Sequence, residues 1–242
     1  MIDLHTHVLP GIDDGPQSIE DALALARGLV ADGVTHAVLT PHVYAEHWPN
    51  TRTSLLPHFE KFKASLEALK IPLRVSLGGE VRLNDALLDL LDRDEIPTLG
   101  VYQGLRTMLL ELPDATIPLG SDKLARHLIA KGYCPIIVHP ERNKAVMARP
   151  EKLEPFVMMG CKIQLTAASV IGEFGKVAYQ TAHVLISREW PIVVASDCHN
   201  MTARAPRMTA ASGFLANKYG SGRCRNLVLE LPAKLVSEFD IA

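Results

Sequence analysis

Short apolar runs alternate with longer segments of helical periodicity along this chain. Seven of the runs have the length of a strand, and most of them show no alternation of apolar and polar positions. We expect strands at the N-terminus and at residues 36–40, 73–77, 108–110, 136–138, 162–165 and 192–195. Strands that are apolar on both sides are typical of a parallel sheet covered by helices on both faces. The pattern therefore predicts an α/β protein.

The segments between the strands carry apolar residues at helical spacing. In the first of them Ser18 can cap a helix, with Asp21 at the capping-box position and Gly33 just past the end. Further helices are expected at residues 54–69, 84–91, 121–130, 151–158 and 177–188. This alternation gives repeated βαβ units. No Gly-rich phosphate-binding fingerprint follows the first strand, which disfavours a nucleotide-binding fold.

Carboxylates and histidines follow five of the predicted strands. The clusters are Asp3-Leu4-His5-Thr6-His7, Thr40-Pro41-His42, Gly78-Gly79-Glu80, Val138-His139-Pro140-Glu141-Arg142 and Ala195-Ser196-Asp197-Cys198-His199. In a parallel β/α barrel the loops after the strands gather at one rim, where single residues from many strands share a site. With seven predicted strands, the placement of the clusters favours a β/α barrel with its chemistry at that rim.

The length and composition agree with a single domain over residues 1–242. Of the 242 residues, 48% are hydrophobic and 21% are charged, and the formal net charge is −2. A β/α barrel commonly runs to about 200–250 residues as one unit. The weak negative charge and the dispersed lysines and arginines give no reason to expect nucleic acid as a partner.

The chain also indicates a compartment. It begins without a recognisable secretory signal, and its apolar runs are too short to cross a bilayer, so we expect a cytoplasmic protein without membrane insertion. Four cysteines stand at positions 134, 161, 198 and 224 and form no close pair. This spacing argues against a cysteine-based zinc site or a redox pair, and it agrees with free thiols in a reducing compartment.

Nine side chains have the chemistry and position of metal ligands. They are His5, His7, Asp14, His42, Glu80, Glu111, His139, Asp197 and His199. His5 and His7 lie one residue apart on an extended segment, so they point the same way and can share an ion. Nitrogen and oxygen ligands without cysteine suit manganese, iron, zinc or magnesium and do not select among them. We expect a metal-dependent hydrolase.

Two arginines lie close to these ligands in the sequence. Arg142 comes three residues after His139, and Arg204 comes five residues after His199. Either one alone could be an ordinary surface residue, but guanidinium groups are suited to bidentate phosphate binding. Three divalent ions, four carboxylates and a hydroxide would leave the site with a charge of about +1, which attracts anions. The arginines therefore predict a phosphate-binding site.

Taken in order, the motifs resemble those of the PHP (polymerase and histidinol phosphatase) superfamily. Within it they are similar to the manganese-dependent protein tyrosine phosphatases of bacterial capsule and exopolysaccharide loci. The similarity rests on the five clusters together with Asp13-Asp14-Gly15-Pro16 and Arg204, and it spans nearly the whole chain. It implies a distorted seven-stranded β/α barrel of the PHP type and an enzyme that hydrolyses phosphotyrosine on a protein. The expected partner is a bacterial tyrosine kinase, whose dephosphorylation would regulate capsule or exopolysaccharide synthesis.

The resemblance also implies a role for each residue in a site of three manganese ions. One ion would be held by His5, His7, Glu80 and Asp197. Glu80 would bridge to a second ion, held also by Glu111 and His139. The third would be held by Asp14, His42 and His199, with Asp13 as an alternative to Asp14. Arg142 and Arg204 would bind the phosphate. The chain departs from the family pattern at Leu231-Pro232, where an asparagine is expected before the proline.

Other functions remain as alternatives. Cys198 and Arg204 have the spacing of a cysteine-dependent tyrosine phosphatase, but the segment lacks the glycines and the preceding histidine that such a site needs. A small-molecule phosphatase such as histidinol phosphatase is disfavoured because a histidine would be expected near Asp14. A non-catalytic metal-stabilised scaffold is disfavoured by the complete ligand set. The loop with Tyr44, His47, Trp48 and Arg52 is either an aromatic lid over a phosphotyrosyl peptide or an ordinary exposed loop.

Overall fold

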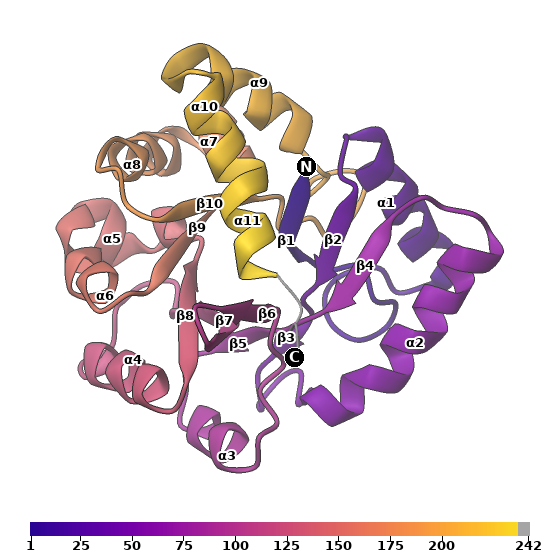
Figure 1. Cartoon of the computed structure of the whole chain (residues 1–242), viewed down its shortest axis with the longest axis horizontal. Helices are drawn as coiled ribbons and strands as arrows, with labels where there is room; N and C mark the ends of the chain where they lie inside the picture. The colour runs from indigo at the N-terminus through magenta and orange to yellow at the C-terminus, as the bar shows by residue number, and fades with distance from the viewer. Residues whose placement is uncertain (237–242) are drawn as a thin grey trace.

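The computed structural model describes residues 1–236 and confirms an α/β fold built mainly from parallel strands (Figure 1). The strands are β1 (Ile2–Thr6), β2 (His36–Leu39), β3 (His42–Val43), β4 (Arg74–Leu77), β5 (Glu80–Arg82), β6 (Gly100–Tyr102), β7 (Leu105–Glu111), β8 (Tyr133–Val138), β9 (Lys162–Thr166) and β10 (Ile192–Ala195). The helices are α1 (Ile19–Ala31), α2 (Arg52–Ala68), α3 (Ala86–Asp92), α4 (Ser121–Ala130), α5 (Lys144–Ala148), α6 (Glu154–Met158), α7 (Ala167–Ile171), α8 (Lys176–Ser187), α9 (Met208–Tyr219), α10 (Ser221–Arg225) and α11 (Leu231–Leu235). Short helical turns form η1 (Pro140–Arg142), η2 (Pro150–Leu153) and η3 (Asn226–Glu230).

The parallel strands form two sheets, not one continuous seven-stranded ladder. β1, β2 and β4 make up the first sheet, and the second has the order β10-β9-β8-β7-β5-β3, with β6 antiparallel to β7. β3 and β5 follow β2 and β4 after short breaks, so both chain paths pass from the first sheet into the second. At the second break, a Cβ on Gly79 would lie 2.8 Å from Pro97 Cγ, which explains the need for glycine there.

β1 lies beside the residues that follow β10. The His7 amide donates a hydrogen bond to the Cys198 carbonyl oxygen, and the Asp197 amide donates one to the His5 carbonyl oxygen, both at 2.9 Å. The register of β1 against β2 shifts between Asp3 and Thr6, as in a β-bulge, and such bulges re-aim side chains near active sites. The two pairs of predicted ligands at the ends of β1 and β10 are thus neighbours.

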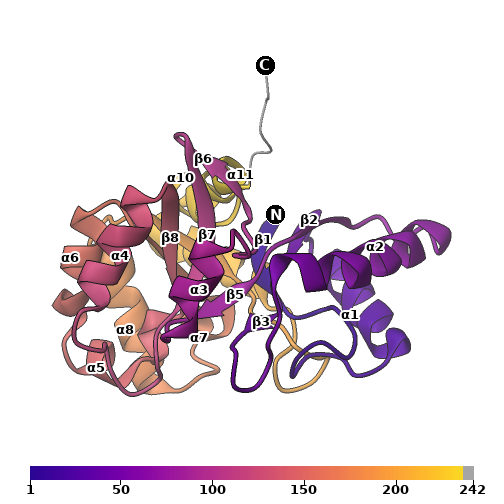
Figure 2. The ribbon, with the colours of Figure 1, turned by 90° about the horizontal axis from the view of Figure 1, so that it is seen from below.

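Apolar residues fill the space enclosed by the strands and the layer between strands and helices. The inner cluster includes Leu4, Leu109 and Ile136, and α11 adds Leu231 and Leu235 to it. Figure 1 shows the other helices around the strands, with α11 across one end. Figure 2 shows α11 and β6 at one end of the strands and β3 at the other. The end that carries His42 in β3 is therefore opposite α11.

All seven predicted strands are present, as β1, β2, β4, β7, β8, β9 and β10. The expected cap of α1 is confirmed, because Ser18 accepts a hydrogen bond from the Asp21 amide. The helix expected at 151–158 is instead two shorter turns, η2 and α6. β6 was not expected; it forms a hairpin with β7 through Gln103 and Gly104, whose φ angles of 52° and 78° are those of a tight two-residue turn.

Two further observations bear on the compartment and chemistry of the chain. Among residues 1–236, no helix combines the length and apolarity needed to cross a membrane. The cysteines at 134, 161, 198 and 224 are all free and buried. The thiols therefore belong to the interior of the fold.

Candidate metal centre and phosphate site

The structure brings the nine predicted ligands together at the ends of the strands. They come from β1 and the loop after it, from β3, β5 and β7, and from the turns that follow β8 and β10: His5, His7, Asp14, His42, Glu80, Glu111, His139, Asp197 and His199. Their ring nitrogens and carboxylate oxygens face one another over short distances. Three overlapping groups can be distinguished.

The first group is centred on His5 and His7. Their Nε2 atoms are 3.1 Å apart, as expected for side chains that point the same way from one extended segment. Glu80 Oε2 is 3.3 Å from both nitrogens. Asp197 Oδ1 is 3.5 Å from His5 Nε2 and 3.6 Å from His7 Nε2. Two imidazoles and two carboxylates thus surround one point.

Glu80 also belongs to a second group. Its Oε1 atom is 2.6 Å from His139 Nε2, and Glu111 Oε1 is 3.9 Å from the same nitrogen. The two oxygens of Glu80 therefore face different partners, as a bridging carboxylate requires. Glu80 occupies this position because β5 begins directly after the break at Gly79.

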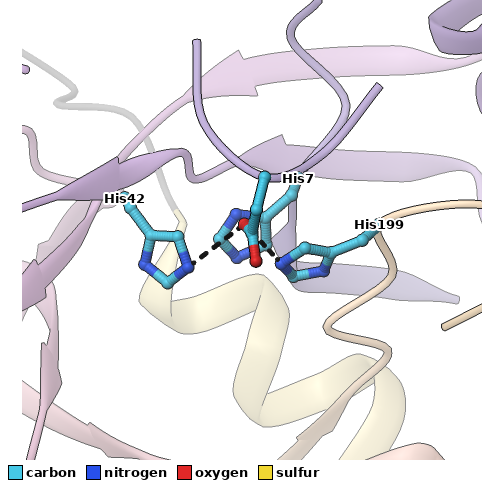
Figure 3. A group of neighbouring side chains, drawn as sticks. His7, His42 and His199 are labelled. Carbon is cyan, nitrogen blue, oxygen red and sulfur yellow. Dashed lines mark ion pairs between the residues drawn. The ribbon is translucent and has the colours of Figure 1, made fainter. Parts of the chain in front are cut away.

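The third group consists of Asp14, His42 and His199. Asp14 Oδ1 is 3.4 Å from His42 Nε2 and 3.1 Å from His199 Nε2. Figure 3 shows these two imidazoles on either side of a carboxylate, with the ring of His7 close by. The rings of His7 and His199 are stacked with their centroids 3.8 Å apart. The third group is therefore adjacent to the first.

Two of the predicted ligand positions have an uncommon backbone conformation. His139 follows β8 directly, Asp197 lies two residues after the end of β10, and their φ angles are 34° and 54°. Residues other than glycine rarely adopt positive φ, and such residues cluster at functional sites. At both positions the left-handed conformation occurs within two residues of the strand end.

The environment keeps three carboxylates ionised. Burial opposes the charge of Asp14, Glu80 and Asp197, but hydrogen bonds and nearby positive charges outweigh it and lower the pKa of each carboxyl below its ordinary value. For Asp197 the largest favourable contributions come from Arg142, His5 and Arg204. Glu111 differs, because burial and the charge of Glu80 raise its pKa to about 7.

The imidazoles of the site divide into two kinds, those with a lowered pKa and those with a raised pKa. Burial, together with the charge of Arg142, lowers the pKa of His139 to about 4. Burial and the charge of His7 likewise lower the pKa of His199 to about 4. At His7 and His42 burial is outweighed by neighbouring carboxylates, which raise the pKa to about 9 and about 11. His139 and His199 thus offer a free lone pair at neutral pH.

This donor set fits divalent metal ions. Three groups have ligand atoms that all lie within 4.8 Å of one another: His5, His7 and Glu80; His42, Glu80 and Glu111; and His7, Asp14, His42 and His199. All the donors are nitrogen or oxygen, which agrees with the borderline-to-hard metals expected from the sequence. In the group with two carboxylates, a bound cation would offset the repulsion between Glu80 and Glu111.

Both predicted arginines line a cleft of about 380 Å³ beside these groups. Arg142 Nη2 is 2.8 Å from Asp197 Oδ2, and Arg204 Nη2 is 2.8 Å from Asp197 Oδ1. Arg204 Nε is buried and makes no hydrogen bond with the described residues. The rest of the cleft is formed by His42, Glu80, Glu111, Leu112, Asp114, Val138, His139 and Asn143. The two guanidinium groups and several of the predicted metal ligands therefore line the same cleft.

Cys198 has neither the exposure nor the pKa of a nucleophile. The residue is fully buried and is not among the described residues that line the cleft. Burial, with the charge of Asp3, raises the pKa of the thiol well above its ordinary value. A reactive cysteine needs a lowered pKa and access to substrate. The structure therefore argues against the thiolate alternative.

Some neighbours of the site were not found from the sequence. Arg82 Nη1 is 2.6 Å from Glu111 Oε1, and Gln164 Oε1 is 2.9 Å from His5 Nδ1. Phe174 lies against the Arg142 guanidinium. Trp48 stacks on His42 and, unlike the other three, belongs to a loop that the sequence had already indicated as a possible aromatic lid. Two signals were available: Arg82 follows Glu80 by two residues, and Gln164 is polar within an apolar strand. Phe174 left no such signal, because it lies in a loop.

Comparison with known proteins identifies the family. The model of the family described as capsular polysaccharide synthesis, CpsB/CapC, matches residues 1–237. The chain belongs to the CpsB/CapC family. The resemblance that the sequence motifs suggested is thereby confirmed.

Individual members of the CpsB/CapC family agree with this assignment. The putative tyrosine-protein phosphatase CapC of Staphylococcus aureus is 33% identical, over 84% of this chain and 79% of its own length. The tyrosine-protein phosphatase YwqE of Bacillus subtilis is 31% identical, over 91% of this chain and 86% of its own length. Both relatives are named as tyrosine-protein phosphatases, which is the enzyme class expected from the sequence.

Solved structures support the CpsB/CapC assignment. A structure from work on YwqE of Bacillus subtilis and CpsB of Streptococcus pneumoniae, described as unique metal-dependent tyrosine phosphatases, matches with a TM-score of 0.90 and 30% identity. The match covers 99% of this chain and 96% of the other. An organophosphorus hydrolase from Deinococcus radiodurans matches with a TM-score of 0.59 at 15% identity, which shows a shared fold alone.

Proposed function

We propose that this CpsB/CapC family member is a single-domain, metal-dependent phosphatase that hydrolyses phosphotyrosine on proteins. The observation that carries the proposal is the cleft in which two arginines and the predicted metal ligands meet. Family membership and the tyrosine phosphatases among its relatives support the reaction. We further propose that the two sheets correspond to the distorted seven-stranded barrel of the PHP type, since hydrogen bonds join β1 to the residues after β10.

The cofactor we propose is three divalent ions, manganese in the first place. His5, His7, Glu80 and Asp197 would hold one ion, and Glu80, Glu111 and His139 a second. Asp14, His42 and His199 would hold the third. The short distances within each group support this division. Bound divalent ions in such a site supply Lewis acidity and lower the pKa of water so that it can attack phosphorus.

The residues of the chain would orient the substrate and balance its charge. Arg142 and Arg204 reach the cleft from different turns, and both present guanidinium N–H groups beside Asp197. A phosphate bound there would accept hydrogen bonds from both, which fixes its orientation and neutralises charge on the phosphoryl oxygens. The buried Nε–H of Arg204 is a donor that an anion could use.

Aromatic side chains in contact with two residues of the cleft, Arg142 and His42, support an aryl phosphate as the substrate. Phe174 lies with its ring 5.3 Å from Arg142 Cζ, and Trp48 stacks on His42 at 4.7 Å. A tyrosine ring extending outward from a phosphate at Arg142 would pass near such surfaces. The phenolate leaving group has a conjugate acid with a pKa of about 10, so it needs less help from a general acid than an alkoxide does.

The partner we propose is a phosphorylated bacterial tyrosine kinase of capsule or exopolysaccharide synthesis. The family description links the chain to capsular polysaccharide synthesis, which supports this choice. A cytoplasmic location would bring enzyme and kinase together, and the four free, buried cysteines agree with a reducing compartment.

The proposal can be tested with matched substrates and two inhibitors. Phosphate release is measured from a phosphotyrosyl peptide, from the same peptide with phosphoserine, and from histidinol phosphate. We expect a chelator to abolish activity, Mn²⁺ to restore it, a thiol alkylator to have no effect, and the phosphotyrosyl peptide to be preferred. Activity that resists the chelator would refute the metal mechanism. Preference for histidinol phosphate would refute the substrate class.

A further inference from the structure

Asp13 and Asp14 are adjacent in the sequence but have different environments. Asp13 is buried, whereas the side chain of Asp14 is 42% exposed. Asp14 directs one oxygen to His42 and His199, as a member of the third ligand group. Asp13 instead contacts His7, a member of the first group. The two carboxylates therefore cannot have the same role.

Both oxygens of Asp13 are engaged by groups of the chain itself. Oδ2 is 2.6 Å from His7 Nδ1, and it also accepts a hydrogen bond from the His42 amide at 3.0 Å. Oδ1 accepts a hydrogen bond from the Gly15 amide at 3.0 Å. Three donors on one buried carboxylate leave little capacity for a metal ion. The same contacts tie the loop after β1 to β3.

Gly15 makes this arrangement possible. A Cβ at position 15 would lie 2.7 Å from the His7 carbonyl oxygen and 3.0 Å from Asp13 Oδ1. Any side chain at position 15 would push the loop away from His7 and lengthen the contact between Asp13 and the imidazole. The close approach of the loop is therefore built into the sequence Asp13-Asp14-Gly15.

We propose that Asp13 is a positioning residue that orients His7 for its metal ion and links the first ligand group to the third through the His42 backbone. The proposal rests on the proposed metal-dependent function. With Nδ1 bound to Asp13, the Nε2 atom of His7 faces Glu80 and Asp197 at 3.3 and 3.6 Å. A carboxylate that accepts the other ring N–H of a metal-bound histidine fixes the ring and raises its basicity.

His5 provides an internal comparison. Its Nδ1 atom faces Gln164 Oε1 at 2.9 Å, so a neutral amide orients this ring. The two histidines of the first group thus have a charged and an uncharged partner. The carboxylate of Asp13 is a stronger hydrogen-bond acceptor than the amide oxygen of Gln164. Asp13 also accepts a hydrogen bond from the His42 amide and so contacts a residue of the third group, which Gln164 does not.

The test is metal binding by Asp13→Asn, with Asp14→Asn as the matched variant on the adjacent residue. Mn²⁺ alone is the probe, and its stoichiometry and affinity are measured by competition with a chelator. For Asp13→Asn we expect the wild-type number of ions with affinity about 10- to 100-fold weaker, as for the loss of other outer partners of metal ligands. For Asp14→Asn we expect one ion fewer.

The outcomes separate this proposal from the proposed function. Wild-type protein that binds no Mn²⁺ would refute the metal-dependent function itself. Asp13→Asn with unchanged affinity would overturn the positioning role, and so would the loss of one ion, because Asp13 would then be a ligand. Thermal unfolding of the metal-free variants serves as the control for stability. A substitution that only destabilises the fold would lower the melting temperature without changing the Mn²⁺ affinity.

Gly15→Ala gives a second route to the same answer if Asp13→Asn does not fold. This variant keeps both carboxylates and displaces the loop from His7, so we expect full stoichiometry with weakened affinity. Unchanged Mn²⁺ affinity in Gly15→Ala, with the same melting temperature of the metal-free protein, would overturn the proposal.

Discussion

Arg142→Ala is the change that tests the phosphate site most directly. Arg142 belongs to η1, follows His139 by three residues, and lines the cleft. Its Nη2 atom is 2.8 Å from Asp197 Oδ2, so the guanidinium is held next to the first ligand group. Truncation to alanine removes this cation and its N–H donors while leaving all nine predicted ligands in place.

The expected loss of transition-state stabilisation is that of removing one hydrogen-bond donor to the charged phosphoryl oxygens. Removing such a donor costs about 2 to 4 kcal/mol, which is about 30- to 1000-fold in kcat/KM. Metal content should stay near that of the wild type, because Asp197 keeps Arg204 at 2.8 Å and His5 at 3.5 Å. Arg142→Lys should fall between wild type and alanine, since an ammonium keeps the charge but not the planar fork.

The assay is steady-state hydrolysis of a phosphotyrosyl peptide, with metal content measured on the same samples. Arg126→Ala removes an exposed arginine on α4 and serves as the control for a change in net charge. Wild-type kcat/KM in Arg142→Ala would refute the phosphate-binding role. Loss of metal along with activity would show instead that Arg142 acts by holding Asp197.

Two further predictions concern buried residues that do not line the cleft, Asp3 and Cys198. Burial raises the pKa of Asp3 to about 6 from an ordinary 3.8. Because the unfolded chain loses this proton more readily, the free energy of unfolding of the metal-free protein falls as pH rises from 3.8 through about 6. The total loss is about 3 kcal/mol. Asp3→Asn should therefore be more stable than wild type in urea at pH 7 and equally stable at pH 4; equal stability at both would contradict this account. Cys198→Ala should keep wild-type turnover, because the thiol is buried away from the cleft; loss of turnover in a folded, metal-loaded variant would favour the thiolate mechanism.

The sequence predicted the positions of the ligands because parallel strands place their ends on the same side. His5 and His7 illustrate the reasoning, since the period of two in an extended segment is enough to bring their Nε2 atoms to 3.1 Å. Strand β7 (Leu105–Glu111) illustrates the same reasoning for residues further apart in the sequence. Its last residue, Glu111, lies 3.9 Å from Nε2 of His139, which follows the next strand. Local periodicity and a parallel topology suffice for such contacts.

Pattern alone could not separate Asp13 from Asp14. Both follow the first strand in a turn, and either carboxylate has the chemistry of a ligand. Their difference depends on how closely the loop approaches His7, which is controlled by the absence of a side chain at Gly15. Gln164 could not be assigned for a similar reason, because its partner His5 is 159 residues away in the sequence.

The remaining gaps lie where regular structure is interrupted. The register shift in β1, the break before Glu80 and the positive φ angles of His139 and Asp197 all fall at predicted ligands. Periodicity describes uninterrupted strands, so it predicts where a strand ends but not how the chain turns there. A non-glycine residue in the left-handed region costs about 1 to 3 kcal/mol and persists only where its surroundings hold it. At His139 and Asp197 the surroundings include Glu80 at 2.6 Å and two arginines at 2.8 Å, so the contacts that define the site also hold its backbone.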